Sequence, residues 1–263
     1  MTSMNDLPLN KLQFYSTAPY PCSYLPEQDA RSQVATPAHI INTQVYSRLV
    51  ESGFRRSGSF TYRPHCERCK ACIPVRIDVA SFSPNRTQRK VWRNHSSLVA
   101  TALPLRFLPD HYELYKRYQS ARHSSGGMDE DSQEQFSHFL LHSNVQTYMV
   151  EFREHAVLKM VSIIDELQDG LSSVYTFFEP EDHQASYGVY NVLWQVDHCL
   201  RAGLKHLYLG YLIHACRKMS YKSQFKALEG FKEGRWRQIE KPTPAPSHLN
   251  IAPTTQSEPS ESV

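Results

Sequence analysis

The sequence lacks any apolar run near the roughly 18–20 residues that a membrane-spanning helix needs. Its opening residues, Met1 to Asp6, supply neither the basic segment nor the apolar segment of a secretory signal. Cysteine is also scarce, with six residues in a chain of 263, which is too few for a disulfide scaffold. We therefore expect no membrane attachment and predict a protein of the reducing cytoplasm.

Hydrophobic residues make up 40% and charged residues 21% of the chain, which is ordinary for a globular protein and excludes wholesale disorder. The net charge of +3 conceals three blocks of charge. Bases outnumber acids by ten to two between Arg55 and Arg93 and by nine to two between Arg201 and Arg237. Acids outnumber bases by twelve to two over 129–182. The basic blocks predict two positive surfaces for a polyanion, unless they are only solvated faces of helices and strands.

Hydrophobic periodicity, punctuated by Pro and Gly, predicts an α+β chain. Helices are expected at 42–52, 84–94, 109–123, 132–142 and 187–201, and strands at 54–62, 72–79, 146–152, 156–165, 171–178 and 206–212. Asp169-Gly170 favours a hairpin between two of these strands. An antiparallel meander followed by a helix and a returning strand is typical of an α+β acyltransferase core. From Lys241 the composition turns to Pro, Ser and Thr, which predicts a disordered tail.

Three cysteines form a C-x-x-C-x-x-C motif at Cys66, Cys69 and Cys72. Thiols at this spacing in a loop can converge on one centre, and thiolates suit zinc or an iron–sulfur cluster, both of which usually have four ligands. Cys22 is the expected fourth ligand, with His65 as a competitor. The alternatives are reduced, metal-free thiols that pack a loop, or a nucleophilic cysteine.

The expected helix at 84–94 places basic residues on one face at i, i+3, i+4 and i+7. These residues are Arg86, Arg89, Lys90 and Arg93. An exposed stripe of this kind fits nucleic-acid phosphates, and Trp92 beside it can stack on a base. The alternative is a helix face that only contributes solubility.

The segment 206–222 combines aromatic, histidine and basic side chains after a short strand that ends near Gly210. Such a mixture is typical of the edge of a site, where hydroxyl, imidazole and cationic groups can bind a ribose-phosphate terminus and stabilise an oxyanion. The candidates are Tyr211, His214, Arg217, Lys218, Tyr221 and Lys222.

Taken together, these segments resemble the aminoacyl-tRNA–protein transferases of the N-degron pathway. The bacterial branch, the aspartate/glutamate leucyltransferases, is the most similar, and it is related to the eukaryotic arginyl-tRNA–protein transferases. The resemblance covers residues 10–240, and the segments that carry it are 21–26 (PCSYLP), 53–58 (GFRRSG), 62–64 (YRP), 66–77 (CERCKACIPVRI), 82–90 (FSPNRTQRK), 209–211 (LGY) and 218–222 (KMSYK). One departure is 186–190 (SYGVY), where the family has S-L-G-T-Y, so a role for a hydroxyl at position 189 is weakened.

The resemblance implies an acetyltransferase-like (GNAT-type) C-terminal core that uses an aminoacyl-tRNA in place of an acyl-CoA. The implied division is 1–95 for a small cysteine-containing N-terminal region, 96–240 for the transfer domain and 241–263 for the tail. In agreement, the sequence offers no glycine-rich loop suited to a CoA pyrophosphate. The basic residues of 86–93, with Arg217, Lys218 and Lys222, are then expected to bind the tRNA.

The implied reaction moves leucine from leucyl-tRNA to the free α-amine of a protein that begins with Asp or Glu, which marks that protein for degradation. An α-amine with a pKa of about 7.7–8.0 is partly nucleophilic near neutral pH, so the enzyme mainly positions its substrates and stabilises the oxyanion. No cofactor is required for this chemistry. Tyr211 and Tyr221 are expected at the reacting centre, and His214 or Asp197 could act as a general base.

Selection of an acidic N-terminal residue requires a cation, and the planar fork of Arg holds both carboxylate oxygens better than Lys does. Arg76 and Arg56 are the candidates, with a structural salt bridge as the alternative for each. Three other functions remain open on the sequence alone: transfer of arginine in place of leucine, an acyl-CoA-dependent N-acyltransferase, and a non-catalytic RNA-binding zinc module.

Overall fold

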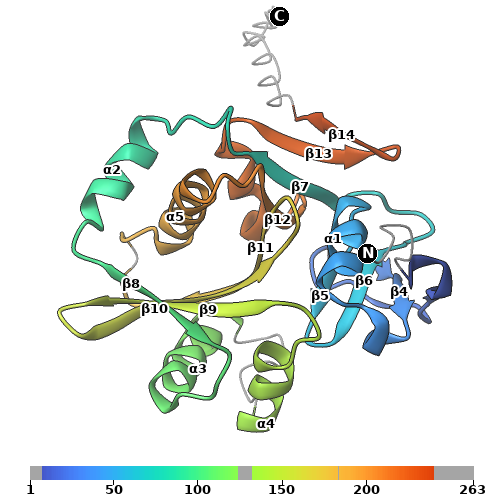
Figure 1. Ribbon diagram of the computed structural model, residues 1–263, viewed down its shortest axis with the longest axis horizontal. Coiled ribbons are helices and arrows are strands. Elements are labelled where there is room, and N and C mark those ends of the chain that lie inside the picture. Colours follow the sequence, from blue (N-terminus) through green and yellow to red (C-terminus); the bar gives the residue numbers. More distant parts are fainter. Residues whose placement is uncertain (1–7, 124–131, 183, 240–263) are drawn as a thin grey trace, which may run out of the picture.

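A computed structural model describes residues 8–123, 132–182 and 184–239 (Figure 1). Its largest sheet contains β7 (Ile73–Asp78), β8 (Val99–Pro104), β9 (Thr147–Glu154), β10 (Val157–Glu166), β11 (Gly170–Phe178), β12 (His206–Leu212), β13 (Leu228–Lys232) and β14 (Arg235–Gln238). The eight strands lie in the order β14-β13-β7-β12-β11-β10-β9-β8. All neighbouring pairs are antiparallel except β11 and β12, which are parallel. The α+β class predicted from the sequence is confirmed.

A smaller sheet at the N-terminal end contains β1 (Gln13–Ser16), β4 (Ser32–Thr36), β5 (Arg55–Ser57) and β6 (Phe60–Pro64), in the order β1-β4-β6-β5. The short strands β2 (Tyr20–Pro21) and β3 (Asp29–Ala30) pair with each other. Helix α1 (Thr43–Glu51) packs beside this sheet, and a cluster of buried side chains joins it to the large sheet through Leu167 and Tyr208 (Figure 1). Two short 3-10 turns, Pro8–Lys11 and Ala38–Ile40, complete the region.

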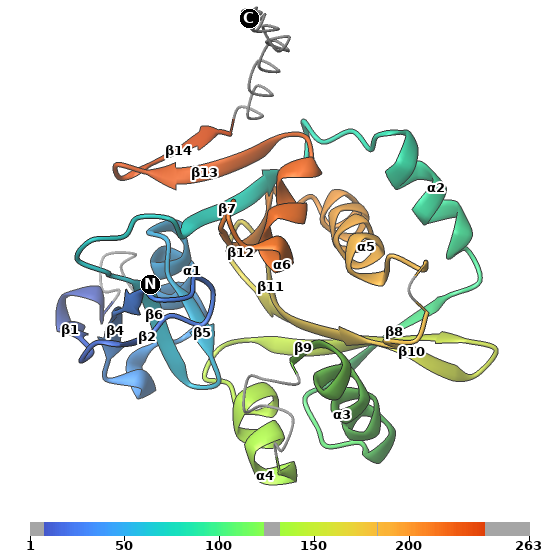
Figure 2. The same ribbon diagram turned by 180° about the vertical axis from the view of Figure 1, so that it is seen from behind.

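Helices cover both faces of the large sheet (Figure 2). On one face α5 (Tyr187–Arg201) packs against β11 and β12, and α2 (Arg86–Asn94) packs against α5. On the other face α3 (Pro109–His123) packs against β10 and β11, close to α4 (Gln133–Phe136) and the π-helical turn Ser137–Leu141. Each face therefore has its own apolar core, and the sheet is buried on both sides over its centre.

The elements with strong local signals form where the sequence predicts them. Helix α1 begins after Asn42, whose side chain accepts a hydrogen bond from the Val45 amide at 3.0 Å. The meander β9-β10-β11, the helix α5 and the returning strand β12 follow in the expected order. The turn around Asp169 and Gly170 closes the β10–β11 hairpin, as the dipeptide indicates.

The structure differs from the sequence predictions in three places. The single strand expected at 54–62 is a hairpin, because Gly58 turns the chain with a φ of +57° between β5 and β6. Strands β8, β13 and β14 were not expected. Strand β7 lies inside the large sheet between β12 and β13, so the sheet takes one of its strands from the region 1–95. The tail expected at 241–263 lies outside the described residues.

The parallel strands β11 and β12 pair over only three residues each. Gly170–Ser172 lies opposite His206–Tyr208, and beyond these residues the two strands separate. The register of β12 with β7 also shifts between Tyr208 and Tyr211, at Gly210, whose φ is +72°. We call the region between the two strands beyond Ser172 and Tyr208 the strand split. A split in a sheet leaves main-chain groups without a ladder partner, so other groups must satisfy them.

Candidate active site

A hollow lies beside the strand split, where the small sheet meets the large one. It is a shallow depression that is partly open to solvent. Its walls come from α1, β5, β7, β11, β12 and β14 and include Phe54, Arg55, Pro74, Ser172, Tyr208, Gly210, Tyr211 and Trp236. The mixture of aromatic, apolar and a few polar side chains is typical of a binding site for a small group.

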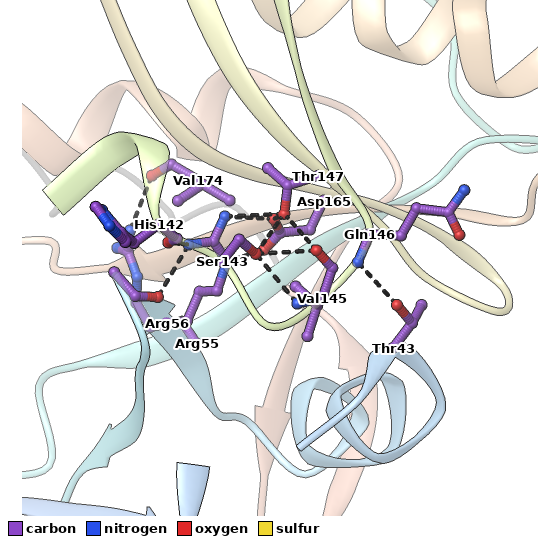
Figure 3. Close-up of polar contacts among 11 residues, drawn as sticks. Thr43, Arg55, Arg56, His142, Ser143, Val145, Gln146, Thr147, Asp165 and Val174 are labelled. Atoms are coloured by element: carbon purple, nitrogen blue, oxygen red, sulfur yellow. Dashed lines mark hydrogen bonds and ion pairs between the residues drawn. The ribbon is translucent and has the colours of Figure 1, made fainter. Parts of the chain in front are cut away.

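Arg55 of β5 lies at the strand split. Its Nη2 donates a hydrogen bond to the Val174 carbonyl of β11 at 3.0 Å (Figure 3). Its Nη1 lies against Gly210 of β12, where an added Cβ would stand 3.0 Å from that nitrogen. Arg55 therefore bridges the two separated strands, and the glycine leaves the room for it.

Lys222 reaches the same place from the 3-10 turn Tyr221–Gln224. Its Nζ donates a hydrogen bond to the Tyr211 carbonyl of β12 at 2.7 Å and lies 3.5 Å from the Met219 sulfur. Burial, followed by the positive charge of Arg55, lowers the pKa of Lys222 from 10.5 to about 7. The expectation that Lys222 binds tRNA from the surface is wrong, because the residue is only 7% exposed.

Within the described part of the chain, neither Arg55 nor Lys222 forms an ion pair with a carboxylate. Their hydrogen bonds go to the backbone carbonyls of Val174 and Tyr211, on the two sides of the split. Arg55 thus lines the hollow, Lys222 binds the backbone of the neighbouring strand β12, and neither has a compensating acid among the described residues.

The neighbouring Arg56 has a different environment. Its side chain is 3% exposed and binds both oxygens of Asp165 on β10, at 2.8 Å from Nε and 2.6 Å from Nη2 (Figure 3). Its other N–H groups donate to Thr147 Oγ1 and to the carbonyls of Gly58 and His142. All five N–H groups of the guanidinium are used. The expectation that Arg56 binds a substrate carboxylate is therefore wrong, and the structural salt bridge named as its alternative is present.

Arg76 on β7 also has partners within the fold. Its Nε lies 2.7 Å from Glu229 Oε2, and Nη1 donates to the Tyr208 hydroxyl at 3.1 Å. The guanidinium stacks on Trp236 at 4.5 Å from the ring centroid. Arg76 therefore forms the structural salt bridge that was named as its alternative role. Two of its other partners, Tyr208 and Trp236, line the hollow.

Tyr211 lies in the wall of the hollow, but its hydroxyl donates to the Gly53 carbonyl at 3.1 Å, with the Tyr62 carbonyl at 3.3 Å. Burial raises the pKa of Tyr211 well above its ordinary value, so the phenol keeps its proton. In this structure the hydroxyl fastens β12 to the small sheet.

The remaining catalytic candidates do not converge. His214 is exposed two residues beyond the end of β12. Asp197 on α5 pairs with Arg201 at 2.9 Å. Tyr221 is 38% exposed, and its ring packs against Phe225. None of the three lines the hollow beside Arg55.

The basic face of α2 is present as predicted. A capping box between Asn85 and Gln88 begins the helix. The four basic residues of the face are all exposed, and they are Arg86, Arg89, Lys90 and Arg93. Trp92 is 38% exposed and packs on Tyr190 of α5, with the ring centroids 5.6 Å apart. Helix α6 (Arg217–Ser220) presents two more exposed cations, Arg217 and Lys218.

The cysteine cluster, which we define as Cys22, Cys66, Cys69 and Cys72, is unbridged and partly buried. Burial, then the nearby thiols of Cys66, Cys22 and Cys69, raise the pKa of Cys72 to about 12, so the four residues lie near one another. Over residues 8–123, 132–182 and 184–239, no three His, Cys, Asp or Glu side chains are arranged to hold a metal ion. The metal state of the cluster stays a prediction.

Sequence reasoning missed Arg55 and misplaced Lys222. A signal for the first was available: Arg55 and Arg56 are consecutive in a strand, so their side chains point to opposite faces and cannot share one role. No sequence signal indicated that Lys222 is buried, because a Lys in a basic segment is ordinarily exposed.

The fold and the site together define an α+β protein with an arginine-lined hollow where two parallel strands separate. The family description "Arginine-tRNA-protein transferase, N terminus" matches residues 20–90, and "Arginine-tRNA-protein transferase, C terminus" matches residues 110–232. The chain belongs to this family of aminoacyl-tRNA–protein transferases, which confirms the resemblance inferred from the sequence segments.

Three similar proteins carry the name aspartate/glutamate leucyltransferase. That of Nitrosospira multiformis is 59% identical over 247 residues, which is 94% of this chain and 98% of the relative. That of Chromobacterium violaceum is 57% identical over 86% of this chain and 93% of the relative, and that of Pseudomonas aeruginosa is 45% identical over 87% and 97%. Among solved structures, L-PGS from Bacillus licheniformis overlaps 55% of this chain and 46% of its own at 9% identity, with a TM-score of 0.44, which is too low to carry an inference.

Proposed function

We propose that this chain transfers leucine from leucyl-tRNA to the N-terminal α-amine of proteins that begin with Asp or Glu, and so marks them for degradation in the N-degron pathway. The observation that carries the proposal is the 59% identity to an aspartate/glutamate leucyltransferase over nearly the full length of both chains. In the part of the chain that the structure describes, no helix is long and apolar enough to cross a membrane. We assign the reaction to the cytoplasm, where its substrates occur.

The reaction forms one C–N bond and breaks one C–O bond. The α-amine nitrogen attacks the ester carbonyl that joins leucine to the terminal ribose, the ribose hydroxyl leaves, and the proton lost by the amine balances the leaving oxygen. The ester is already activated, and an amine with a pKa of about 7.7–8.0 is partly neutral at pH 7, so positioning supplies much of the rate. The oxyanion that forms on the carbonyl requires hydrogen-bond donors or cations that point at it.

We propose that the large sheet is an acetyltransferase-like core in which the strand split receives the reacting ends of both substrates. Support comes from the parallel pair β11–β12, which separates after three residues, and from the hollow beside it. The exposed cations of α2 and α6 are the groups that we assign to the tRNA phosphates, because binding of phosphate requires cations at the surface.

For the cysteine cluster we propose binding of zinc or an iron–sulfur cluster, with Cys22, Cys66, Cys69 and Cys72 as ligands. Thiols are suitable ligands for such a group, and the effect of the other three thiols on the pKa of Cys72 places them near it, although the four side chains would have to move together to coordinate a metal. Its effect would be structural: it would join the loop after β2 to the segment that leads into β7, whose continuation forms part of the hollow. The transfer chemistry needs nothing from it.

The experiment that tests the proposed function combines the full chain with charged tRNA and a peptide. Leucyl-tRNA and arginyl-tRNA are supplied in parallel to peptides that differ only in a first residue of Asp, Glu, Gln or Lys. We expect a mass increase of one leucine residue on the Asp and Glu peptides. Transfer from arginyl-tRNA alone would overturn the choice of leucine, and transfer only from acetyl-CoA would overturn the reaction class.

A further inference from the structure

Arg55 and Lys222 are two buried or partly buried cations at one place in the fold. Burial of a charge is unfavourable unless an opposite charge or strong hydrogen bonds compensate it. Arg56, one residue away, shows the ordinary solution, since it meets both oxygens of Asp165. Arg55 and Lys222 have only the carbonyls of Val174 and Tyr211, and no ion pair among the described residues. An anion from outside the fold would compensate these charges.

Three structural features hold the two cations in place. Arg55 comes from β5, and the ion pair of its neighbour Arg56 fixes that strand to β10. Gly210 allows the guanidinium to lie against β12. Lys222 approaches Tyr211 of the same strand from the C-terminal side of the chain. Because the cations are fixed before any ligand arrives, little conformational entropy remains to be lost when an anion binds.

We propose that Arg55 and Lys222 together bind the side-chain carboxylate of the N-terminal Asp or Glu of the acceptor protein. The proposal rests on the proposed function, because it assigns the acceptor subsite of that reaction. It replaces Arg56, whose guanidinium is fully used, and Arg76, which pairs with Glu229.

A carboxylate of the acceptor fits this place better than a phosphate of the tRNA does. Arg55 lines a hollow with walls such as Phe54, Pro74 and Trp236, and Lys222 is buried against the same strand β12, whereas the cations of α2 and α6 lie on the surface. A small side chain can enter a hollow, but a polynucleotide backbone follows a surface. The positive charge of Arg55 also repels an N-terminal Lys or Arg, so the subsite both selects the correct acceptor and rejects the opposite charge.

The test compares the wild type with Arg55→Gln, Lys222→Met and the control Arg48→Gln, in which an exposed arginine paired with Glu51 is replaced. Each full-length protein is assayed with saturating leucyl-tRNA and with peptides that begin with Glu or Gln and are otherwise identical. We expect Arg55→Gln to lower kcat/KM for the Glu peptide about 100-fold through KM, with a smaller loss for Lys222→Met. Activity on the Gln peptide should fall much less than activity on the Glu peptide, and the affinity for leucyl-tRNA should not change. The Arg48→Gln protein should behave as the wild type.

Two results would overturn the proposal: an unchanged preference for Glu over Gln in Arg55→Gln, or a loss of leucyl-tRNA affinity in place of peptide affinity, which would mark a phosphate subsite. Leucine transfer by the wild type tests the proposed function itself. A failure of the proposed function is therefore distinguishable from a failure of the acceptor-subsite proposal. If Arg55→Gln does not fold, Arg55→Lys is used instead. This variant retains the positive charge and loses the planar guanidinium that can hold both carboxylate oxygens. Titration calorimetry of this variant with the Glu and Gln peptides, without tRNA, should show a reduced preference for Glu; an unreduced one refutes the proposal.

Discussion

Replacement of Lys222 with Met should remove a pH dependence from the stability of this protein. Folding lowers the pKa of Lys222 from 10.5 to about 7, because the residue is buried and faces the charge of Arg55, with the Cys216 thiol acting weakly in the opposite direction. Between these two values the unfolded chain binds more protons than the folded one, so the free energy of unfolding rises with pH. Below pH 7 the ammonium is charged in both states, and its full burial cost is present.

The magnitude follows from the two pKa values. Each pH unit between them contributes up to about 1.4 kcal/mol, and partial titration near pH 7 reduces the change from pH 7 to pH 9 to about 2 kcal/mol. Lys222→Met keeps the length and apolar stem of the side chain but has no titrating group. It also loses the hydrogen bond to the Tyr211 carbonyl, which shifts its stability by a similar amount at both pH values.

The measurement is urea unfolding of both proteins at pH 7 and pH 9, under reducing conditions and without substrate. The cysteines and tyrosines titrate in both proteins, so the difference between the two pH effects isolates Lys222. We expect the wild type to gain about 2 kcal/mol more than Lys222→Met over this interval. Equal pH effects in the two proteins would refute the reasoning, since Lys222 would then keep its charge throughout and would need an anionic partner within the fold.

Three further predictions concern other parts of the chain. Asp165→Asn should lower the free energy of unfolding by about 3–5 kcal/mol in a denaturant titration, because Arg56 would stay buried without its partner; a loss below 1 kcal/mol would contradict the role of this pair. Replacement of Arg86, Arg89 and Arg93 by Ala should reduce the slope of log tRNA affinity against log salt by about 2–3, and an unchanged slope would make α2 a solvated face. Protein purified without oxygen should contain near-stoichiometric zinc or iron, and Ser at any position of the cysteine cluster should lower it; a metal-free protein with full activity would favour packed thiols.

Elements with a local signal could be predicted from the sequence, and those defined by distant pairing could not. Helix α5 carries an apolar stripe and matches its predicted bounds, and the β10–β11 hairpin follows its Asp-Gly turn. Strands β13 and β14 are short; β13 acquires its identity from pairing with β7, which is about 150 residues away in the sequence, and β14 pairs with β13 at the edge of the sheet. Nothing in a window of ten residues encodes that contact.

The same limit applied to the site. The sequence indicated that a cation must recognise the acidic substrate and that the segment after Gly210 belongs to the site, and both stay predictions. It offered Arg56 and Arg76 and passed over Arg55, because the burial of Arg56 depends on Asp165, which is 109 residues away in the sequence. Lys222 was assigned to the surface for a similar reason, since only the approach of its turn to β12 buries it.

The two adjacent arginines divide one structural task. Arg56 fixes β5 to β10 through Asp165, and Tyr211 fixes β12 to the small sheet through the Gly53 carbonyl. These contacts determine where Arg55 can be, because a strand held at one residue presents the next residue to its opposite face. A change at Arg56 would therefore lower stability and displace Arg55 together, whereas a change at Arg55 removes a charge and leaves the attachment of β5 in place. The difference between these two variants separates the support of the site from the site itself.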